Sequence, residues 1–195
     1  MTPPPRLGVL ASGGGSNTLA LIEAHRRGDL AAPIVLVVSN NSRAGALKHA
    51  REHGISAEHI SGRSHADVSH AILAALHKHA VDIVVLAGYM KLLGHTVLAS
   101  FPGRVLNIHP GPLPRFGGPG MFGSHVHEAV LRSSTTHSGP TVHLVDARYD
   151  EGPVIAHRRV PVRSDDTSDS LAARVRAAEH DLYWKVIQDQ FCGTR

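Results

Sequence analysis

The chain has 195 residues, of which 42% are hydrophobic and 18% are charged. At roughly 150 residues per domain, this length predicts a single domain over residues 1–195, and the composition excludes a disordered chain and a fibre. A net charge of +4 favours anionic ligands. The basic residues are scattered, however, and four Phe, three Tyr and one Trp residues are too few for a base-stacking surface. We therefore expect no nucleic-acid partner.

Two features indicate the compartment. Cys192 is the only cysteine, so no internal disulfide can form, which suits a reducing environment. The chain begins Met1-Thr-Pro-Pro-Pro-Arg6, where a signal peptide would need an apolar stretch, and no run of 18 apolar residues occurs. We expect a cytoplasmic protein that does not enter the membrane.

In chain order, short apolar runs alternate with helix-length segments, a pattern typical of a parallel sheet covered by helices. Strands are predicted over Leu7–Ala11, Ile34–Ser39, Ser56–Ile60, Asp82–Leu86 and Val105–Ile108. Helices are predicted over Thr18–Arg27, Ala44–His53 and His65–Lys78, the last opened by Ser64. The first, second and fourth strands are almost continuously apolar and should be central, because both of their faces must be buried.

After about residue 138 the spacing of the elements changes. Strands predicted over Thr141–Val145 and Val154–Val160 are joined by a short turn, as in an antiparallel pair. A final helix from about Thr167 to Gln190 places one apolar stripe, Leu171, Val175, Ala178, Leu182 and Ile187. The predicted fold class is α/β: an open, mostly parallel Rossmann-like sheet with helices on both faces and an antiparallel C-terminal strand pair.

A glycine-rich segment, Ser12-Gly-Gly-Gly-Ser-Asn17, joins the first strand to the first helix. Glycines let the backbone approach an anion closely, and the first N–H groups of a helix favour a phosphate. The segment is not the dinucleotide fingerprint, because Thr18 stands where the third glycine would be. Two interpretations remain open: a phosphate cradle completed by Ser16 and Asn17, or a tight turn that one of these residues caps.

Asn107 and His109 are two residues apart at the end of a predicted strand. Their side chains should therefore share one face at the carboxyl edge of the sheet, where ligands bind in open α/β folds. An amide donates hydrogen bonds without titrating, and an imidazole can pass a proton near neutral pH. The pair could stabilise the oxyanion formed when a carbonyl is attacked. Polar side chains at a strand end could equally serve the loop backbone.

Three carboxylates follow the next predicted strand: Asp146, Asp150 and Glu151, the last two in an Asp-Glu-Gly-Pro turn. A carboxylate held in such a turn could take a proton from a reacting amine. Chemistry alone does not choose among the three, and a turn of this composition needs no function.

In order and spacing, these motifs resemble those of the phosphoribosylglycinamide formyltransferases, folate-dependent enzymes of purine synthesis. The resemblance covers nearly the whole chain and rests on residues 11–17, 38–40, 85–90, 106–110, 139–143 and 150–153. Each motif is weak or moderate alone, but their order is specific. The glycine-rich stretch between Pro114 and His127 is longer than in the most familiar members. We expect that loop to be mobile and carry over no residue role within it.

The resemblance implies a set of site residues. The catalytic residues would be Asn107, His109 and Asp150. The substrate phosphate would be held by Gly15, Ser16 and Asn17. The folate would contact Met90, Leu92, Leu93 and the chain near Asp146, with Arg63 toward its glutamate tail. Thr141 and His143 would support the site.

The resemblance also implies the reaction. The amine of glycinamide ribonucleotide would attack the formyl group of 10-formyltetrahydrofolate, the co-substrate, directly through a tetrahedral intermediate. Asn107 and His109 would stabilise the oxyanion, and Asp150 would move the proton, through a water. No metal would be needed. Glycinamide ribonucleotide and reduced folate would be the partners, and the chain would be a monomer or a homodimer.

Related enzymes offer alternative functions. A methionyl-tRNA or nucleotide-sugar formyltransferase would share the Asn-x-His core, and a formyltetrahydrofolate hydrolase would replace the amine by water. These enzymes usually carry a further domain, for which we expect no room in this chain.

Two other classes of function are weaker alternatives. Sixteen histidines, with His125 and His127 close together, suggest a metal-binding protein, but their spacing matches no standard site. A non-enzymatic phosphate binder would keep the glycine-rich segment but would have no use for Asn107, His109 and Asp150 together.

Overall fold

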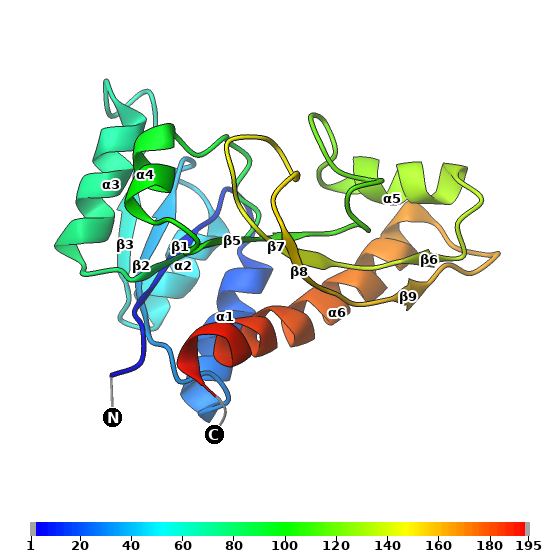
Figure 1. Ribbon diagram of the computed structural model, residues 1–195, viewed down its shortest axis with the longest axis horizontal. Helices are drawn as coiled ribbons and strands as arrows, with labels where there is room; N and C mark the ends of the chain where they lie inside the picture. Colours follow the sequence, from blue (N-terminus) through cyan, green and yellow to red (C-terminus); the bar gives the residue numbers. More distant parts are fainter. Residues whose placement is uncertain (1–2, 194–195) are drawn as a thin grey trace.

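The computed structural model describes residues 3–193; Met1 and Thr2, which open the proline-rich start of the chain, lie outside this range. Seven strands form one sheet in the order β3-β2-β1-β4-β5-β7-β8 (Figure 1). Their bounds are β1 Leu7–Leu10, β2 Ile34–Ser39, β3 Ser56–His59, β4 Ile83–Leu86, β5 Val105–His109, β7 Thr141–Leu144 and β8 Val154–His157. β1 to β5 are parallel, whereas β7 and β8 are antiparallel to their neighbours. The predicted fold class is confirmed.

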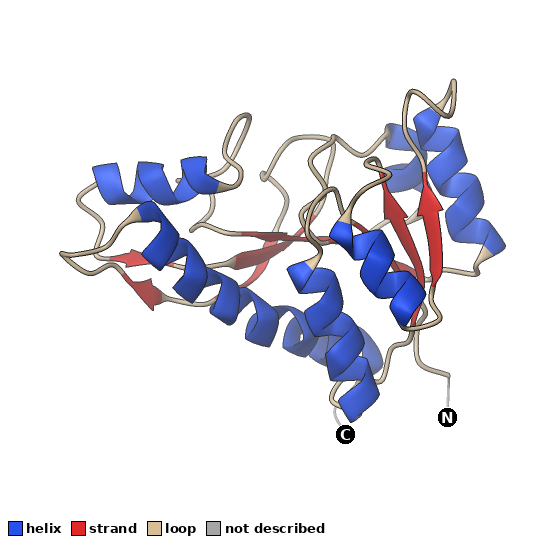
Figure 2. Cartoon of the chain, turned by 180° about the vertical axis from the view of Figure 1, so that it is seen from behind, coloured by secondary structure: helices blue, strands red, loops and turns tan. Residues whose placement is uncertain are grey.

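Helices cover both faces of the sheet (Figure 2). Their bounds are α1 Ser16–Arg27, α2 Gly45–Glu52, α3 Val68–Lys78, α4 His95–Ser100, α5 Ser124–Arg132 and α6 Ser168–Ile187, followed by a π-helical turn over Gln188–Cys192. A second, two-stranded sheet pairs β6 (His137–Ser138) with β9 (Val160–Pro161). No helix within residues 3–193 is long and apolar enough to cross a membrane.

Alternation along the central strands creates two cores. Val9 and Val85 point into the core that α1, α2 and α6 cover, whereas Leu10 and Leu86 point into the core under α3 and α4. Successive side chains of a strand face opposite sides of a sheet, so strands that are apolar throughout fill both layers. The expectation of central, doubly buried strands is confirmed for β1, β2 and β4.

Several predicted boundaries are wrong. The third helix begins at Val68, after Asp67 accepts a hydrogen bond from the backbone N–H of His70, while Ser64 instead bonds to the carbonyl of Ser61. The strand predicted over Val154–Val160 divides into β8 and β9, because the chain leaves the sheet after His157 and pairs next with β6. Helices α4 and α5 and strand β6 were not predicted.

The inward stripe of α6 also differs from the prediction. Leu171, Val175 and Ile187 are buried as expected, but Glu179 and Tyr183 stand in the stripe in place of Ala178 and Leu182. These five buried residues are spaced by four, so the inward face follows i, i+4 steps toward the middle of the sheet. A carboxylate thus lies on the buried side of the helix.

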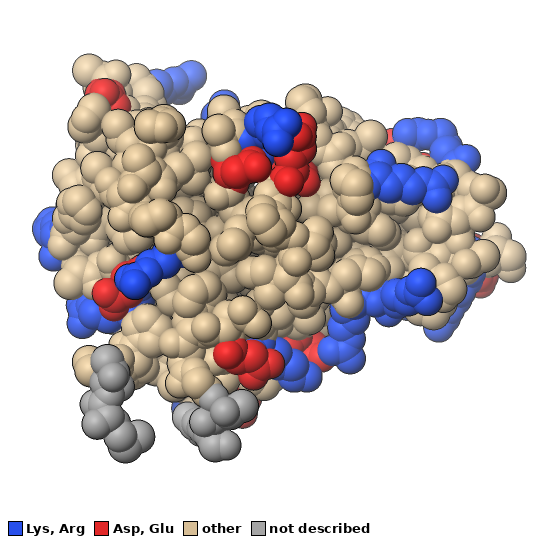
Figure 3. Space-filling view, in the orientation of Figure 1, with Lys and Arg blue, Asp and Glu red and all other residues tan. Residues whose placement is uncertain are grey.

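Charged side chains occur in small groups on the face shown in Figure 3, most of which carries neither sign. The scattered cations expected from the sequence therefore form no broad basic surface on that face. The expected absence of a nucleic-acid partner stays a prediction.

Candidate active site

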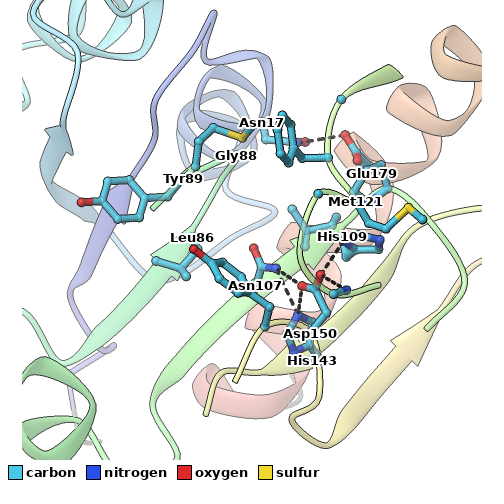
Figure 4. A pocket seen from close by; sticks show the side chains of 18 of the residues that line it. Asn17, Leu86, Gly88, Tyr89, Asn107, His109, Met121, His143, Asp150 and Glu179 are labelled. Carbon is cyan, nitrogen blue, oxygen red and sulfur yellow. Dashed lines mark hydrogen bonds and ion pairs between the residues drawn. The ribbon is translucent and has the colours of Figure 1, made fainter. Parts of the chain in front are cut away.

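A cavity of about 680 Å³ opens at the carboxyl edge of the sheet, beyond β4 and β5. One side is formed by the segments 88–93 and 107–110, and the other by α6 between Ser168 and Glu179. The loop 118–124 and the chain near Asp150 close the remaining sides. Figure 4 shows polar side chains from separate elements directed toward one another in this cavity. This edge is where open α/β sheets bind ligands.

Asn107 lies at the floor of the cavity on β5, directly opposite His143 on the antiparallel strand β7. The Nδ1–H of His143 donates to the carbonyl of Leu144 at 2.8 Å, which turns Nε2 toward the amide of Asn107. The Nδ2 amide of Asn107 donates to that Nε2 at 3.0 Å. This chain of hydrogen bonds fixes the amide and leaves its second N–H for another acceptor.

His109, two residues further along β5, is buried. Its Nε2–H donates to the carbonyl of Phe116 at 2.7 Å, which places the lone pair of the neutral ring on Nδ1. Nδ1 lies 3.5 Å from Oδ2 of Asp150. Burial lowers the pKa of His109, although the negative charge of Asp150 opposes the effect.

Asp150 faces both of these side chains from the turn between β7 and β8. Its Oδ1 lies 3.5 Å from Nδ2 of Asn107, and its Oδ2 accepts a hydrogen bond from the backbone N–H of Gly118 at 3.0 Å. Burial would raise the pKa of Asp150, but the neighbouring imidazoles of His143 and His109 and the backbone N–H of Gly118 outweigh it, so the pKa stays below its ordinary value. The carboxylate is therefore ionised beside two imidazoles.

The structure thus brings together the three side chains that the resemblance implied, Asn107, His109 and Asp150. An amide donor, an imidazole and an ionised carboxylate within 3.5 Å contacts can stabilise an oxyanion and accept a proton. Asp150 has φ +57°, a backbone conformation that residues other than glycine seldom adopt. Such conformations cluster at active sites.

The glycine-rich segment packs tightly at the start of α1. Gly15 has φ +79°, and a Cβ there would lie 2.5 Å from Cα of Ala46, so only glycine fits. Gly15 occupies the N-cap position and no side chain caps the helix, which contradicts a cap by Ser16 or Asn17. Ser16 is exposed, whereas Asn17 lines the cavity. The first N–H groups of α1 remain available to an anion.

Glu179 is a site residue that sequence reasoning missed. It lies on the inner face of α6, is 8% exposed and accepts a hydrogen bond from Nδ2 of Asn17 at 3.0 Å. Burial raises the pKa of Glu179 to about 7. The available signal was its position four residues after Val175 and four before Tyr183, both on the buried stripe.

Four residues predicted to contact the folate line the opposite side of the cavity: Met90, Leu92, Leu93 and Asp146. Met90 and Leu92 are about half exposed, with exposed fractions of 45% and 52%, so their apolar side chains are free to pack against a flat ligand. Arg63 lies elsewhere, in an adjoining cavity of about 690 Å³ that shares Tyr89, Lys91 and Leu92 with the first.

Thr141 supports the loop after His109. Its hydroxyl donates to the carbonyl of Gly111 at 2.8 Å and accepts from the backbone N–H of Leu113 at 3.3 Å. Within residues 3–193, no group of three or more His, Cys, Asp or Glu side chains is arranged to hold a metal ion.

Comparison with known proteins identifies the family. The family model for formyl transferase matches residues 5–187. A chloroplastic phosphoribosylglycinamide formyltransferase of Vigna unguiculata is 41% identical over 190 residues, which are 94% of this chain and 60% of that protein. The corresponding Arabidopsis thaliana protein is 40% identical over 93% of this chain and 64% of its own length. The chain thus spans about three fifths of these plant proteins.

Bacterial relatives match over more of their length. The phosphoribosylglycinamide formyltransferase of Escherichia coli K12 is 38% identical, over 92% of this chain and 84% of its own. A crystal structure of the Brucella melitensis enzyme of that name has a TM-score of 0.89 and 42% identity, and the match covers 98% of each chain. The chain therefore belongs to the formyl transferase family, in the branch of the phosphoribosylglycinamide formyltransferases.

Proposed function

We propose that this protein transfers the formyl group of 10-formyltetrahydrofolate to the amine of glycinamide ribonucleotide, a step of purine biosynthesis. The observation that carries the proposal is the convergence of Asn107, His109 and Asp150 at the floor of one cavity. The membership of the family supports the choice of substrates.

The ribonucleotide occupies the side of the cavity nearest α1 and α6. Its phosphate binds the free N–H groups of Ser16 and Asn17 after Gly15, where the helix dipole favours an anion. The carboxylate of Glu179, held beside Asn17, accepts hydrogen bonds from the sugar hydroxyls. This placement directs the amine of the substrate toward Asn107.

The folate occupies the opposite side of the cavity. Met90, Leu92 and Leu93 offer an apolar surface for its ring system, and the chain near Asp146 offers polar backbone groups at the ring edge. Arg63, in the adjoining cavity, lies toward the solvent end of such a ligand and suits the carboxylates of its glutamate tail.

In the reaction the amine attacks the formyl carbon, and the carbonyl oxygen gains negative charge. The second N–H of Asn107 donates to this oxygen, because the first is already bonded to His143. His109 donates to the same oxygen from Nδ1 as the imidazolium, whose second proton comes from solvent and stays on the ring through the transfer. Asp150 takes the proton lost by the nitrogen, through a water, and releases it to the departing folate nitrogen.

A single-turnover assay tests the proposed function. Mixing the protein with 10-formyltetrahydrofolate and glycinamide ribonucleotide should give formylglycinamide ribonucleotide and tetrahydrofolate in equal amounts. Without the amine, the folate should stay formylated. Formate release at the same rate without the amine would instead identify a hydrolase, and consumption of neither substrate would reject the proposal.

The cytoplasmic location and the monomeric or homodimeric state expected from the sequence stay predictions. Light scattering coupled to size-exclusion chromatography measures the second directly, and any larger assembly would contradict it.

A further inference from the structure

The Ser12 side chain joins three segments that leave the sheet side by side. Ser12 follows β1 and opens the glycine-rich segment. Its hydroxyl donates to Oδ1 of Asn40, just after β2, at 2.6 Å. The same oxygen accepts a hydrogen bond from the backbone N–H of Met90, beyond β4, at 2.8 Å. One hydroxyl is therefore donor to one segment and acceptor for another.

The Ser12 backbone strengthens this junction. Its N–H donates to the carbonyl of Gly88 at 3.0 Å, and its carbonyl accepts from Nδ2 of Asn41 at 3.3 Å. Four hydrogen bonds thus connect Ser12 with residues 40–41 and 88–90. In the strand order, β1 lies between β2 and β4, so no other strand end could reach both neighbours.

The hydroxyl is also oriented. A serine hydroxyl has one proton and two lone pairs. Because the proton is given to Asn40, a lone pair is left for the N–H of Met90. Met90 lies beyond the end of β4, and Gly88, two residues before it, has φ +75°, so the chain here has already left the regular ladder. The hydrogen bond to Ser12 fixes the direction in which residues 88–93 continue along the cavity.

We propose that Ser12 is a positioning residue for the folate side of the cavity, an inference that rests on the proposed function. Ser12 begins the glycine-rich segment, which is proposed to bind the phosphate. Its hydroxyl nevertheless holds the backbone of residues 88–93, which supplies Met90, Leu92 and Leu93 to the folate side of the cavity. Removal of the hydroxyl should impair use of the folate and leave use of the ribonucleotide unchanged. If the Ser12 hydroxyl instead bound the phosphate, its removal would impair use of the ribonucleotide and leave use of the folate unchanged.

Steady-state kinetics with each substrate varied in turn test this assignment. Ser12→Ala should raise the KM for 10-formyltetrahydrofolate about tenfold, while the KM for glycinamide ribonucleotide stays within twofold of wild type. Ser12→Thr, which keeps a hydroxyl, should restore most of the folate KM. Asn17→Ala, which removes the side chain that holds Glu179 on the ribonucleotide side, should show the reverse pattern. Ser100→Ala, which removes an exposed hydroxyl on α4, is the neutral control.

A mutant cycle with Asn40 tests the orientation of the hydroxyl. Asn40→Ala frees the Ser12 proton but keeps the oxygen, so the folate KM should rise less than in Ser12→Ala. The double variant should resemble Ser12→Ala alone, because residues in one hydrogen-bond network are not additive. If the increases in folate KM of the two single variants multiply in the double variant, Ser12 and Asn40 do not act in one network and the proposed orientation of the hydroxyl is wrong.

Amide hydrogen exchange gives a readout that needs no activity. Ser12→Ala should speed exchange in peptides covering residues 88–93 and leave those covering β5 unchanged. Unchanged exchange at 88–93, or equal increases in both KM values, overturns the inference while the proposed function stands. A wild-type protein that transfers no formyl group overturns the proposed function, and the folate assignment of Ser12 with it.

Discussion

The orientation of one amide is the most consequential detail at the scale of single residues. Asn107 is held by His143, whose own tautomer is set by the carbonyl of Leu144. An amide oriented before the substrate arrives costs no reorganisation during the reaction, and this is how oxyanion donors accelerate acyl transfer. His143 therefore acts through Asn107.

Asn107→Ala should lower turnover at least about a hundredfold, because loss of one oxyanion donor typically costs about 2.7–4 kcal/mol. Binding of glycinamide ribonucleotide should be largely kept, since its proposed phosphate and sugar contacts lie on α1 and α6. Single-turnover rates and calorimetric titration measure the two effects. Near-normal turnover in this variant would refute the role given to Asn107.

The raised pKa of Glu179 predicts that the free energy of unfolding depends on pH. Its pKa is about 7 in the folded protein and about 4.5 in the unfolded chain. Between these values Glu179 binds more protons in the folded state, so its contribution to stability falls as pH rises from about 4.5 to 7 and then levels off. At 1.36 kcal/mol per pKa unit the loss would be on the order of 3 kcal/mol.

Urea unfolding of Glu179→Gln at several pH values tests this dependence. The variant keeps an oxygen for Asn17 but cannot ionise, so over pH 4.5–7 the wild type should lose stability relative to the variant. Glu52→Gln, which alters an exposed carboxylate on α2, is the matched control and should keep the wild-type slope. An identical slope in Glu179→Gln would show that Glu179 does not titrate as proposed.

Part of the site could be predicted from the sequence at this scale. The i, i+2 spacing on a strand was enough to place Asn107 and His109 on one face, and the family resemblance selected Asp150 from three carboxylates. The contact between Asn107 and His143 depends on the register of β5 against β7, which local pattern does not encode. The role of Glu179 depends on how α6 is rotated about its axis, which packing decides.

At the scale of elements, the N-terminus of α6 is the best-defined helix start. Thr167 and Ser170 form a reciprocal capping box, in which each side chain accepts from the backbone N–H of the other. The first turn after this cap, at Ser168 and Asp169, lines the cavity. The cap therefore fixes part of the cavity wall as well as the helix.

Thr167→Ala should destabilise the protein by about 0.5–2 kcal/mol, the usual cost of losing an N-cap hydroxyl. Thermal and urea unfolding measure the change. Thr136→Ala, which removes an exposed hydroxyl outside any helix, should change stability by less than about 0.5 kcal/mol. Equal effects in the two variants would argue against the capping role.

Elements with strong periodicity were predicted well, and those defined by tertiary contacts were not. Apolar runs placed β1, β2 and β4 within one residue of their observed ends. α4 has only six residues, too few for a helical period to be visible. α5 follows a glycine-rich loop and turns Val126 and Val130 toward α6, a packing that local composition does not reveal.

At the scale of the whole molecule, α6 connects the sheet centre with the extension formed by α5, β6 and β9. Its first half packs with Val126 and Val160 in a third core, and its second half packs under β4 and β5. The cavity lies along the first part of this helix, which lines it between Ser168 and Glu179. Attachment of α6 to the sheet therefore determines how the two sides of the cavity face each other.

Tyr183 makes that attachment. The side chain is 1% exposed, and its hydroxyl lies 2.9 Å from the carbonyl oxygen of Leu86 and 3.2 Å from that of Leu106. These are the last residue of β4 and the residue before Asn107, so the phenol shares its proton between the ends of two strands. Removing the hydroxyl leaves both carbonyls without this donor in a dry core.

Tyr183→Phe should therefore destabilise the protein by about 1–3 kcal/mol, the range for leaving a buried polar group unsatisfied. For a chain of this size, each kcal/mol corresponds to about 2–4 °C in Tm, which scanning calorimetry resolves. The ring is kept, so no cavity opens and the loss reports the hydroxyl alone. Tyr149→Phe, at an exposed tyrosine, is the matched control. An unchanged Tm in Tyr183→Phe would mean that the phenol does not hold the helix to the sheet, and the packing of Val186 and Ile187 would then account for the attachment.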